Sequence, residues 1–359
     1  MNDYEIWFAI SQLSYTTKNI LLNNFKTLDE IWYYSIHDKK NEFINEKVRS
    51  ILKKSWDKDK INNLKTKLLS ENINTVVITD SMYPERLKKY EDSPYMLFYK
   101  GDIKKLNTKS SAGIVGSRNC TNYGINVTNI ICESLCENNV NIISGMARGI
   151  DSIAHKKCIS KNSYTCAVLG SGIDVVYPRE NFKIYNDIIN NGCIISQFLP
   201  GTKPYAYNFP IRNRIISALS DILIVVEAGE KSGSLITAGA ALDQGKDVIA
   251  VPCNIFSSES KGTNQLIKEG AYILTDIEDV FQLLHIENTK QIPQVNLKMK
   301  TLEKVVYDNI NSSPIHFDDI LRLTKIDIKQ LYEVLFELQL REEIMYISGN
   351  YYVRNNKRI

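Results

Sequence analysis

Residues 111–151 read SAGIVGSRNCTNYGINVTNIICESLCENNVNIISGMARGID and contain the pattern of one strand, helix and strand unit. Its runs AGIVG (112–116) and VNIIS (140–144) are apolar on both faces, as strands buried inside a parallel sheet must be. A helical stretch separates them, and parallel neighbours need such a crossover. This unit therefore predicts an α/β fold.

The same rhythm continues toward the C-terminus. Five further apolar runs, each followed by a helical stretch, are CAVLG (166–170), CIIS (193–196), ILIVV (222–226), VIAV (248–251) and AYIL (271–274). Repeated units of this kind indicate an extended Rossmann-like, mostly parallel sheet, which we assign to residues 76–284.

The segment before the sheet is helical in pattern. Apolar side chains recur at three- and four-residue spacing over residues 1–75, which predicts a small helical module. We expect the lysines of its second half to form a solvated helix face. They are Lys47, Lys53, Lys54, Lys58, Lys60, Lys65 and Lys67.

The segment after the sheet has two parts. Residues 285–300 are polar and aperiodic, which indicates a linker. Residues 301–359 show three amphipathic stretches and two β-prone runs, the pattern of a winged-helix-like domain. Its third helix, within 327–343, is net acidic and would be repelled by phosphates, so we expect this domain to bind protein or its own chain rather than duplex DNA.

Composition narrows the function classes. Hydrophobic residues make up 43% and charged residues 24% of the 359, without an apolar run of about 18 residues or a signal-peptide pattern, so we expect a cytoplasmic protein without a membrane partner. Seven cysteines without a CxxC pair predict neither disulfides nor a metal site.

Basic and acidic side chains nearly balance, with 19 and 15 in residues 1–109, 14 and 16 in 110–284, and 11 and 10 in 285–359. Any anion site must therefore be built locally.

Glycine-rich loops follow several of the predicted strands. They include Gly116-Ser117-Arg118, Gly145 to Gly149, Gly170-Ser171-Gly172 and Gly229 to Ser234. Ligands of open parallel sheets bind at the carboxyl ends of the strands, where helix N-termini present free N–H groups. The loops therefore favour an anion site over simple tight turns.

Cations and aromatic side chains lie close to these loops in the sequence. Residues 177–183 read YPRENFK, and Tyr205, Tyr207 and Phe209 precede Arg212-Asn213-Arg214. Arginines hold phosphates in two contacts, and an aromatic face stacks on a base without identifying it. This combination suits a nucleic acid strand better than a small anion.

Enzyme patterns are weaker. The segment after 170 carries only part of a dinucleotide-binding fingerprint, and the phosphate loop of the NTPases is absent from the sequence. Asp151 and His155 share one helix face, but without further spaced ligands we expect them to be structural. Cys132 and Cys136 are expected in the core.

Eight ordered segments resemble the DNA-processing protein A family, also called DprA or Smf. They are Tyr83-Pro84 with SPYMLFYKG (93–101), GIVGSR (113–118), SGMARGID (144–151), AVLGSGID (167–174), YPREN (177–181), FPIRNRIIS (209–217), VVEAGEKSGSLITA (225–238) and KGTNQLIKEGA (261–271). The terminal regions also resemble the family's N-terminal helical (SAM-like) module and its C-terminal domain. Ser196-Gln197 and Pro252-Cys253 depart from the Ser-Glu and Pro-Gly of many members.

The resemblance implies a protein that binds and protects single-stranded DNA, loads the RecA recombinase onto it during natural transformation, and needs neither catalysis nor a cofactor. It also implies a homodimer, which we place on Leu266, Ile267, Tyr272 and Leu274. The residues expected to contact DNA are Gly116, Ser117, Arg118, Arg148, Gly172, Arg179, Asn181, Lys183, Phe209, Arg212, Asn213, Arg214, Ser232, Gly233 and Ser234.

The residues leave two alternative functions open. The sheet and loops also resemble the phosphoribohydrolases related to lysine-decarboxylase-like proteins, but the SGSLITAGAAL stretch has no glutamate at the catalytic position of that motif. Glu227 precedes the loop and is expected to orient backbone. The other alternative, a transcription factor reading duplex DNA with its winged helix, is weakened by the charge of the third helix.

Overall fold

A computed structural model describes residues 2–38, 41–288, 301–341 and 343–355. The chain divides into two compact units, Met1–Glu287 and Asn288–Ile359, which are described separately. Most of the predicted linker, residues 289–300, lies outside the described residues.

The first unit is built on one large sheet. Among the described residues its nine strands lie in the order β1-β2-β6-β5-β4-β3-β7-β8-β9. The seven predicted runs form the parallel strands β3 (Ser111–Val115), β4 (Asn141–Ser144), β5 (Thr165–Val168), β6 (Cys193–Ser196), β7 (Ile222–Val225), β8 (Asp247–Ala250) and β9 (Tyr272–Ile273). The predicted Rossmann-like, mostly parallel sheet is therefore confirmed.

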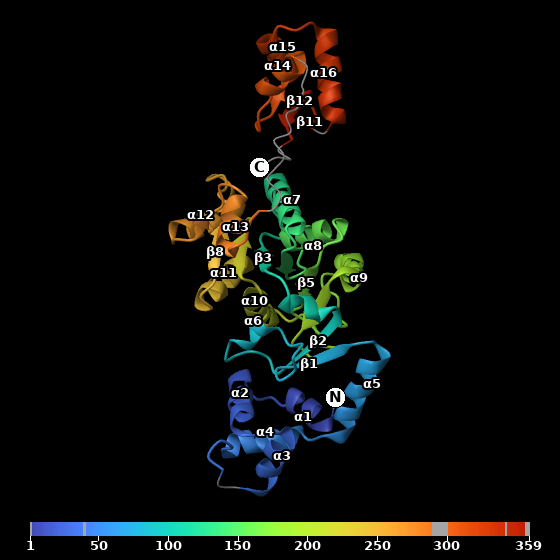
Figure 1. Ribbon diagram of the computed structural model, residues 1–359, viewed down its shortest axis with the longest axis vertical. Coiled ribbons are helices and arrows are strands. Elements are labelled where there is room, and N and C mark those ends of the chain that lie inside the picture. The colour runs from blue at the N-terminus through green and yellow to red at the C-terminus, as the bar shows by residue number, and fades with distance from the viewer. Residues whose placement is uncertain (1, 39–40, 289–300, 342, 356–359) are drawn as a thin grey trace. The chain divides into compact units, whose positions relative to one another are not determined.

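The sheet is longer than the sequence pattern indicated. Strands β1 (Asn74–Val77) and β2 (Met96–Gly101) pair antiparallel with each other, and β2 pairs antiparallel with β6. These two strands extend the sheet past β6 and bring it against the N-terminal helices (Figure 1).

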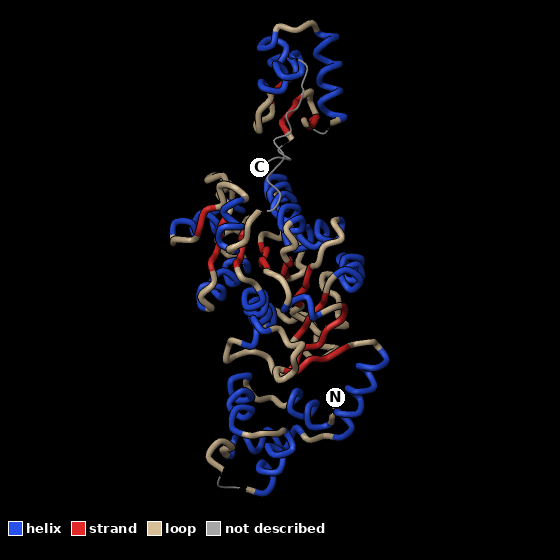
Figure 2. The backbone as a smooth tube through the Cα atoms, viewed as in Figure 1, coloured by secondary structure: helices blue, strands red, loops and turns tan. Residues whose placement is uncertain are grey.

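Helices cover both faces of the parallel strands (Figure 2). Alternate residues along each strand feed separate cores: Ile143 and Val225 belong to one cluster, and Ile142 and Ile224 belong to the other. The covering helices are α6 (Glu85–Lys88), α10 (Asn208–Leu219), α11 (Gly233–Asp243) and α12 (Lys261–Lys268) on the first face, and α7 (Asn122–Glu137), α8 (Ile150–Ser160) and α13 (Glu278–Leu284) on the second. Because both faces are buried, these strands are apolar throughout.

The N-terminal helices form a module that shares a core with the sheet. They are α1 (Asp3–Ile10), α2 (Tyr15–Asn24), α3 (Leu28–His37), α4 (Glu46–Ser55) and α5 (Lys58–Ser70). Each begins at a polar residue whose side chain accepts a backbone N–H, namely Asn2, Ser14, Thr27, Asn45 and Asp57. Trp7 Nε1 donates to the Leu52 carbonyl at 2.9 Å, and the cluster continues through Phe98 of β2 to α9 (Phe182–Asn191).

The second unit has the predicted three helices and a hairpin in its described part. They are α14 (Thr301–Asn309), α15 (Phe317–Thr324), α16 (Ile328–Leu340) and a sheet of β10 (Ile315–His316), β12 (Tyr351–Arg354) and β11 (Ile344–Ile347). Arg341 contacts both oxygens of the buried Glu303 carboxylate at 3.1 and 3.2 Å. Over the described ranges, none of the helices has the length and apolar character needed to span a lipid bilayer.

Candidate functional site

The order of the strands marks one place in the sheet for a ligand. From β3 the chain proceeds outward through β4, β5 and β6, and then returns to the other side of β3 with β7. Ligands of open α/β sheets bind outside the carboxyl ends of the strands at such a switch point. The loops that follow β3 and β7 line a cavity of about 700 Å³ here, together with residues of α10.

The open side of this cavity is positively charged. Arg118 is exposed, and its guanidinium carbon lies 5.9 Å from the centre of the Phe209 ring. Lys231 is also exposed at the cavity, next to Ser232, which caps the N-terminus of α11 by accepting the Ser234 N–H. A helix N-terminus carries a partial positive charge, so cations and helix favour an anion together.

The floor of the cavity is a buried charge network. Arg212 is 4% exposed and donates to the carbonyl oxygens of Gly145 and Val168 and to Asn213 Oδ1. The Asp151 carboxylate accepts the N–H groups of Gly145 and Ala147 at 3.1 and 3.3 Å. Burial lowers the pKa of Arg212 to about 10, and Asp151 opposes that shift. Burial also raises the pKa of Asp151, which Arg212 partly offsets.

Two glutamates near the switch point bind protein groups. Glu259 accepts a hydrogen bond from the Ser117 hydroxyl at the cavity wall. Glu227 is 1% exposed, and its oxygens accept the N–H and the hydroxyl of Thr121 at 2.8 and 2.6 Å, where α7 begins. The expectation that Glu227 orients backbone is confirmed.

Nine of the expected DNA contacts line this cavity: Gly116, Ser117, Arg118, Phe209, Arg212, Asn213, Ser232, Gly233 and Ser234. Asn213 is 7% exposed and, like Arg212, is hydrogen-bonded to protein groups. Both therefore hold the floor in place, whereas Arg118 faces outward.

The other six expected residues lie outside the cavity lining. Gly172 is buried beneath the β6–α10 loop, where its N–H donates to Thr202. Asn181 is 4% exposed and donates to the Met146 carbonyl, so it supports the loop after β4. A direct DNA contact does not fit the burial of these two residues.

The remaining four are charged and reach solvent. Arg148 contacts both oxygens of Glu180 at 2.8 and 2.9 Å, and Arg214 pairs with Asp92 at 2.7 Å. Arg179 and Lys183 are exposed near the start of α9. Their contact with DNA stays a prediction.

Several lining residues were absent from the expected set. They are Asp151, Tyr177, Lys231 and Glu259, among others. Lys231 had a readable signal, since it directly precedes the serine-glycine turn that was assigned to the site. Glu259 had none, because it is brought to Ser117 from 142 positions away by the fold.

His155, Cys132 and Cys136 are buried in the first unit. His155 is fully buried, its Nδ1 lies 2.7 Å from the Thr165 hydroxyl, and burial lowers its pKa to about 3. Cys132 and Cys136 lie on the buried face of α7, in the core on one side of the sheet. In the described part of the chain, three or more His, Cys, Asp or Glu side chains are nowhere grouped as a metal site.

The residues expected at a dimer contact differ in accessibility. Leu266 is 8% exposed and belongs to the core of its own chain, so it offers little surface to a partner, and its place in a dimer contact stays a prediction. Ile267 and Leu274 are half-buried against the core clusters. Tyr272 is 51% exposed on β9, which pairs only with β8 among the described strands.

Comparison with known proteins gives consistent results. Residues 74–285 match the family model of DNA recombination-mediator protein A. DNA processing protein DprA of Bacillus subtilis (strain 168) is 41% identical over 220 residues, which cover 61% of this chain and 74% of the relative. The X-ray structure of DprA from Streptococcus pneumoniae superposes with a TM-score of 0.68 at 32% identity, covering 79% of this chain and 98% of that one.

A second solved structure covers less of the chain. DprA from Helicobacter pylori, solved to give insight into its single-stranded DNA binding mode, superposes with a TM-score of 0.54 at 31% identity over 59% of this chain and 95% of that one. The residues that match the family model, 74–285, include the parallel sheet and the cavity at its switch point. The chain belongs to the DNA recombination-mediator protein A family, the DprA and Smf proteins.

Proposed function

We propose that this protein binds single-stranded DNA in the switch-point cavity and acts, without catalysing a reaction, as the mediator that protects the strand and loads a RecA-type recombinase onto it. The observation that carries the proposal is the joint position of Arg118, the N-terminus of α11 and the Phe209 ring around one cavity. The single-stranded DNA named for the Helicobacter pylori relative supports this choice of ligand.

The surroundings of the cavity favour unpaired bases. Tyr205 and Tyr207 stack at 5.4 Å with an 8° interplanar angle, and they are 46% and 66% exposed. The centres of the Tyr177 and Phe209 rings lie 5.9 Å apart. Exposed aromatic faces stack readily on the bases of a single strand, while arginine and helix N-termini hold the backbone phosphates.

The carboxylates near the cavity argue against a hydrolase. Glu227 is bonded to Thr121 and almost completely buried, so its oxygens do not reach a ligand. The Glu259 carboxylate is bound by Ser117, and Asp151 by two backbone N–H groups. We therefore propose that these groups shape the site and do not transfer protons.

Partners and compartment remain part of the proposal. A mediator of this family would work in the cytoplasm as a homodimer, and we place the contact at the edge strand β9, where Tyr272 and Ile273 are exposed. Tyr272→Lys should shift the protein toward monomer in sedimentation velocity while leaving its far-UV circular dichroism spectrum unchanged, because the side chain is exposed and the fold does not depend on it. An unchanged mass distribution would remove β9 from the interface.

The DNA site is tested by replacing its exposed cation. Arg118→Ala should weaken binding to dT strands of every length and flatten the slope of log K against log salt by about 0.7, the value for one lost phosphate contact on a single strand. Lys156→Ala, which removes an exposed charge from α8 outside the cavity lining, is the matched control. Equal slopes for wild type and Arg118→Ala would contradict the assignment.

A further inference from the structure

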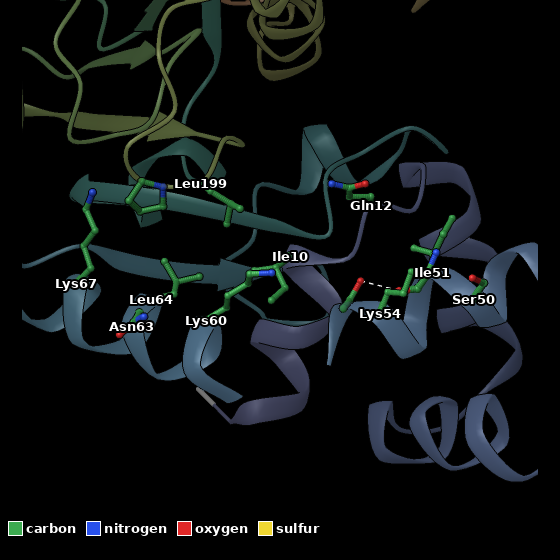
Figure 3. A pocket seen from close by; sticks show the side chains of 12 residues that line it. Ile10, Gln12, Ser50, Ile51, Lys54, Lys60, Asn63, Leu64, Lys67 and Leu199 are labelled. Carbon is green, nitrogen blue, oxygen red and sulfur yellow. Dashed lines mark hydrogen bonds between the residues drawn. The ribbon is translucent and has the colours of Figure 1, made fainter. Parts of the chain in front are cut away.

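A second cavity of about 700 Å³ lies between the N-terminal helices and the sheet (Figure 3). The side chains that line it come from α1 and the segment after it, from α4 and α5, and from the loop between β6 and α10. They are Ile10, Gln12, Ser50, Ile51, Lys54, Ser55, Lys60, Asn63, Leu64, Lys67, Leu199 and Pro200.

The charged side chains that line this cavity are all positive. Of the described residues that line it, three are lysines and none is a carboxylate. Lys54 is exposed on α4, and Lys60 on α5 is 72% exposed at its side chain, with an ion pair to Asp57 at 3.2 Å. An exposed ion pair of this kind contributes little to stability, so Lys60 can leave Asp57 and bind the phosphate of a ligand.

The third lysine has a positioning role. Lys67 pairs with Asp174 at 2.6 Å, and the other oxygen of Asp174 accepts the Gly201 N–H at 2.7 Å. This chain of contacts ties α5 to the loop that roofs the cavity. The cavity is therefore built from fixed elements and leaves Lys54 and Lys60 to meet a ligand.

The remaining lining suits a nucleoside. Ile10, Ile51, Leu64 and Leu199 offer apolar area for a base, and Figure 3 shows Lys60 and Leu64 on α5 beneath the loop that carries Leu199. Hydroxyl and amide groups, such as those of Ser50 and Asn63, supply donors and acceptors for sugar and base edges.

One loop borders both cavities. Leu199 and Pro200 line the second cavity, while Pro204 and Ala206 of the same loop line the switch-point cavity. Four residue steps separate Pro200 from Pro204, which span at most about 14 Å of chain. The stacked, exposed pair of Tyr205 and Tyr207 belongs to this loop.

We propose that the second cavity binds a nucleotide through its phosphate at Lys54 and Lys60 and its base on the apolar wall, as the continuation of the strand held at the switch point. This inference rests on the proposed function, and it adds a ligand to two lysines, Lys54 and Lys60, that are exposed as the sequence predicts. The same chemistry would accept a free nucleotide, so the test treats the two sources separately.

The first arm measures strand binding against length. Fluorescence anisotropy with a series of labelled dT oligonucleotides compares wild type, Lys54→Ala/Lys60→Ala and the matched control Lys53→Ala/Lys58→Ala, which removes two exposed lysines of the same helices outside the cavity lining. For strands long enough to reach the second cavity, the salt slope of the cavity variant should fall by about 1.4, for two lost contacts. The shortest strands that bind should show no change.

The second arm titrates labelled dTMP into the same three proteins. Binding to wild type and control that is lost in the cavity variant supports the site with a free nucleotide as its ligand, even if strands fail to bind and the proposed function falls. A cavity variant that matches the control in both arms overturns the inference. Equal losses on the shortest strands overturn the proposed continuation, because the lysines would then act at the first cavity or through bulk charge.

Discussion

Removing Arg212 should destabilise the first unit strongly, because it would leave a buried carboxylate without its positive neighbour. An ideal Cβ on Gly145 would lie 2.5 Å from Arg212 Nη1 and 2.8 Å from Asp151 Oδ2, so both charged groups approach one point beside the backbone. Arg212 also donates hydrogen bonds to three buried oxygens, so its removal leaves those acceptors unpaired and the Asp151 charge without its offset, at a cost of about 3–5 kcal/mol. For a unit of this size, the variant Arg212→Met should lower the thermal midpoint by an amount on the order of 10 °C.

The pH dependence of this loss follows from Asp151. Burial already raises its pKa, and removing the guanidinium raises it further. The folded state then binds more protons than the unfolded state above the usual pKa of an aspartate, so stability falls as the pH rises through that window. The destabilisation by Arg212→Met should therefore be smaller at pH 5 than at pH 8.

Thermal unfolding followed by tryptophan fluorescence measures this loss. The three tryptophans, Trp7, Trp32 and Trp56, lie in the N-terminal module, whose core continues into the sheet. Asp151→Asn and the double variant complete a mutant cycle. The loss in the free energy of unfolding should be smaller in the double variant than the sum of the two single losses, by at least about 1 kcal/mol. A loss below about 1 kcal/mol for Arg212→Met, or strictly additive losses, would refute the account of the network.

Three further predictions concern packing, pH and the second unit. Gly124→Ala should cost about 1–3 kcal/mol in chemical denaturation, because its Cβ would lie 2.2 Å from the buried Glu227 carboxylate, whereas Gly239→Ala, with open space around it, should be neutral or stabilising. Lys18→Met should raise the thermal midpoint at pH 6, because burial lowers the pKa of Lys18 to about 7. The gain should shrink between pH 7 and 10, where the folded lysine is already neutral. A gain that does not depend on pH would contradict this. Deleting residues 296–359 should leave the affinity for single strands unchanged by anisotropy; a large loss would show that the second unit binds DNA.

The fold was largely predictable because the apolar runs of a parallel sheet are local patterns. Strands β1 and β2 escaped prediction, since their place at the antiparallel end of the sheet is decided by the pairing of β2 with β6, about a hundred residues away. Periodicity shows which residues form a strand or helix but does not show which distant element it meets.

The site was predictable as a set of loops and less so as individual contacts. Arg212 and Arg214 lie two positions apart on α10 and therefore point to different sides of the helix, which places one in the cavity floor and pairs the other with Asp92. Gly172 and Asn181 belong to matching motifs, but they support loops from beneath. A motif shows that a residue is needed without showing which way its side chain faces.

The central claim is that the switch-point cavity selects single-stranded DNA. Equilibrium binding of the full chain to a labelled dT strand and to a duplex of the same length, titrated with salt, tests it most directly. We expect tight, salt-dependent binding of the strand and much weaker binding of the duplex. Failure to bind the strand, or equal affinity for both, would contradict it.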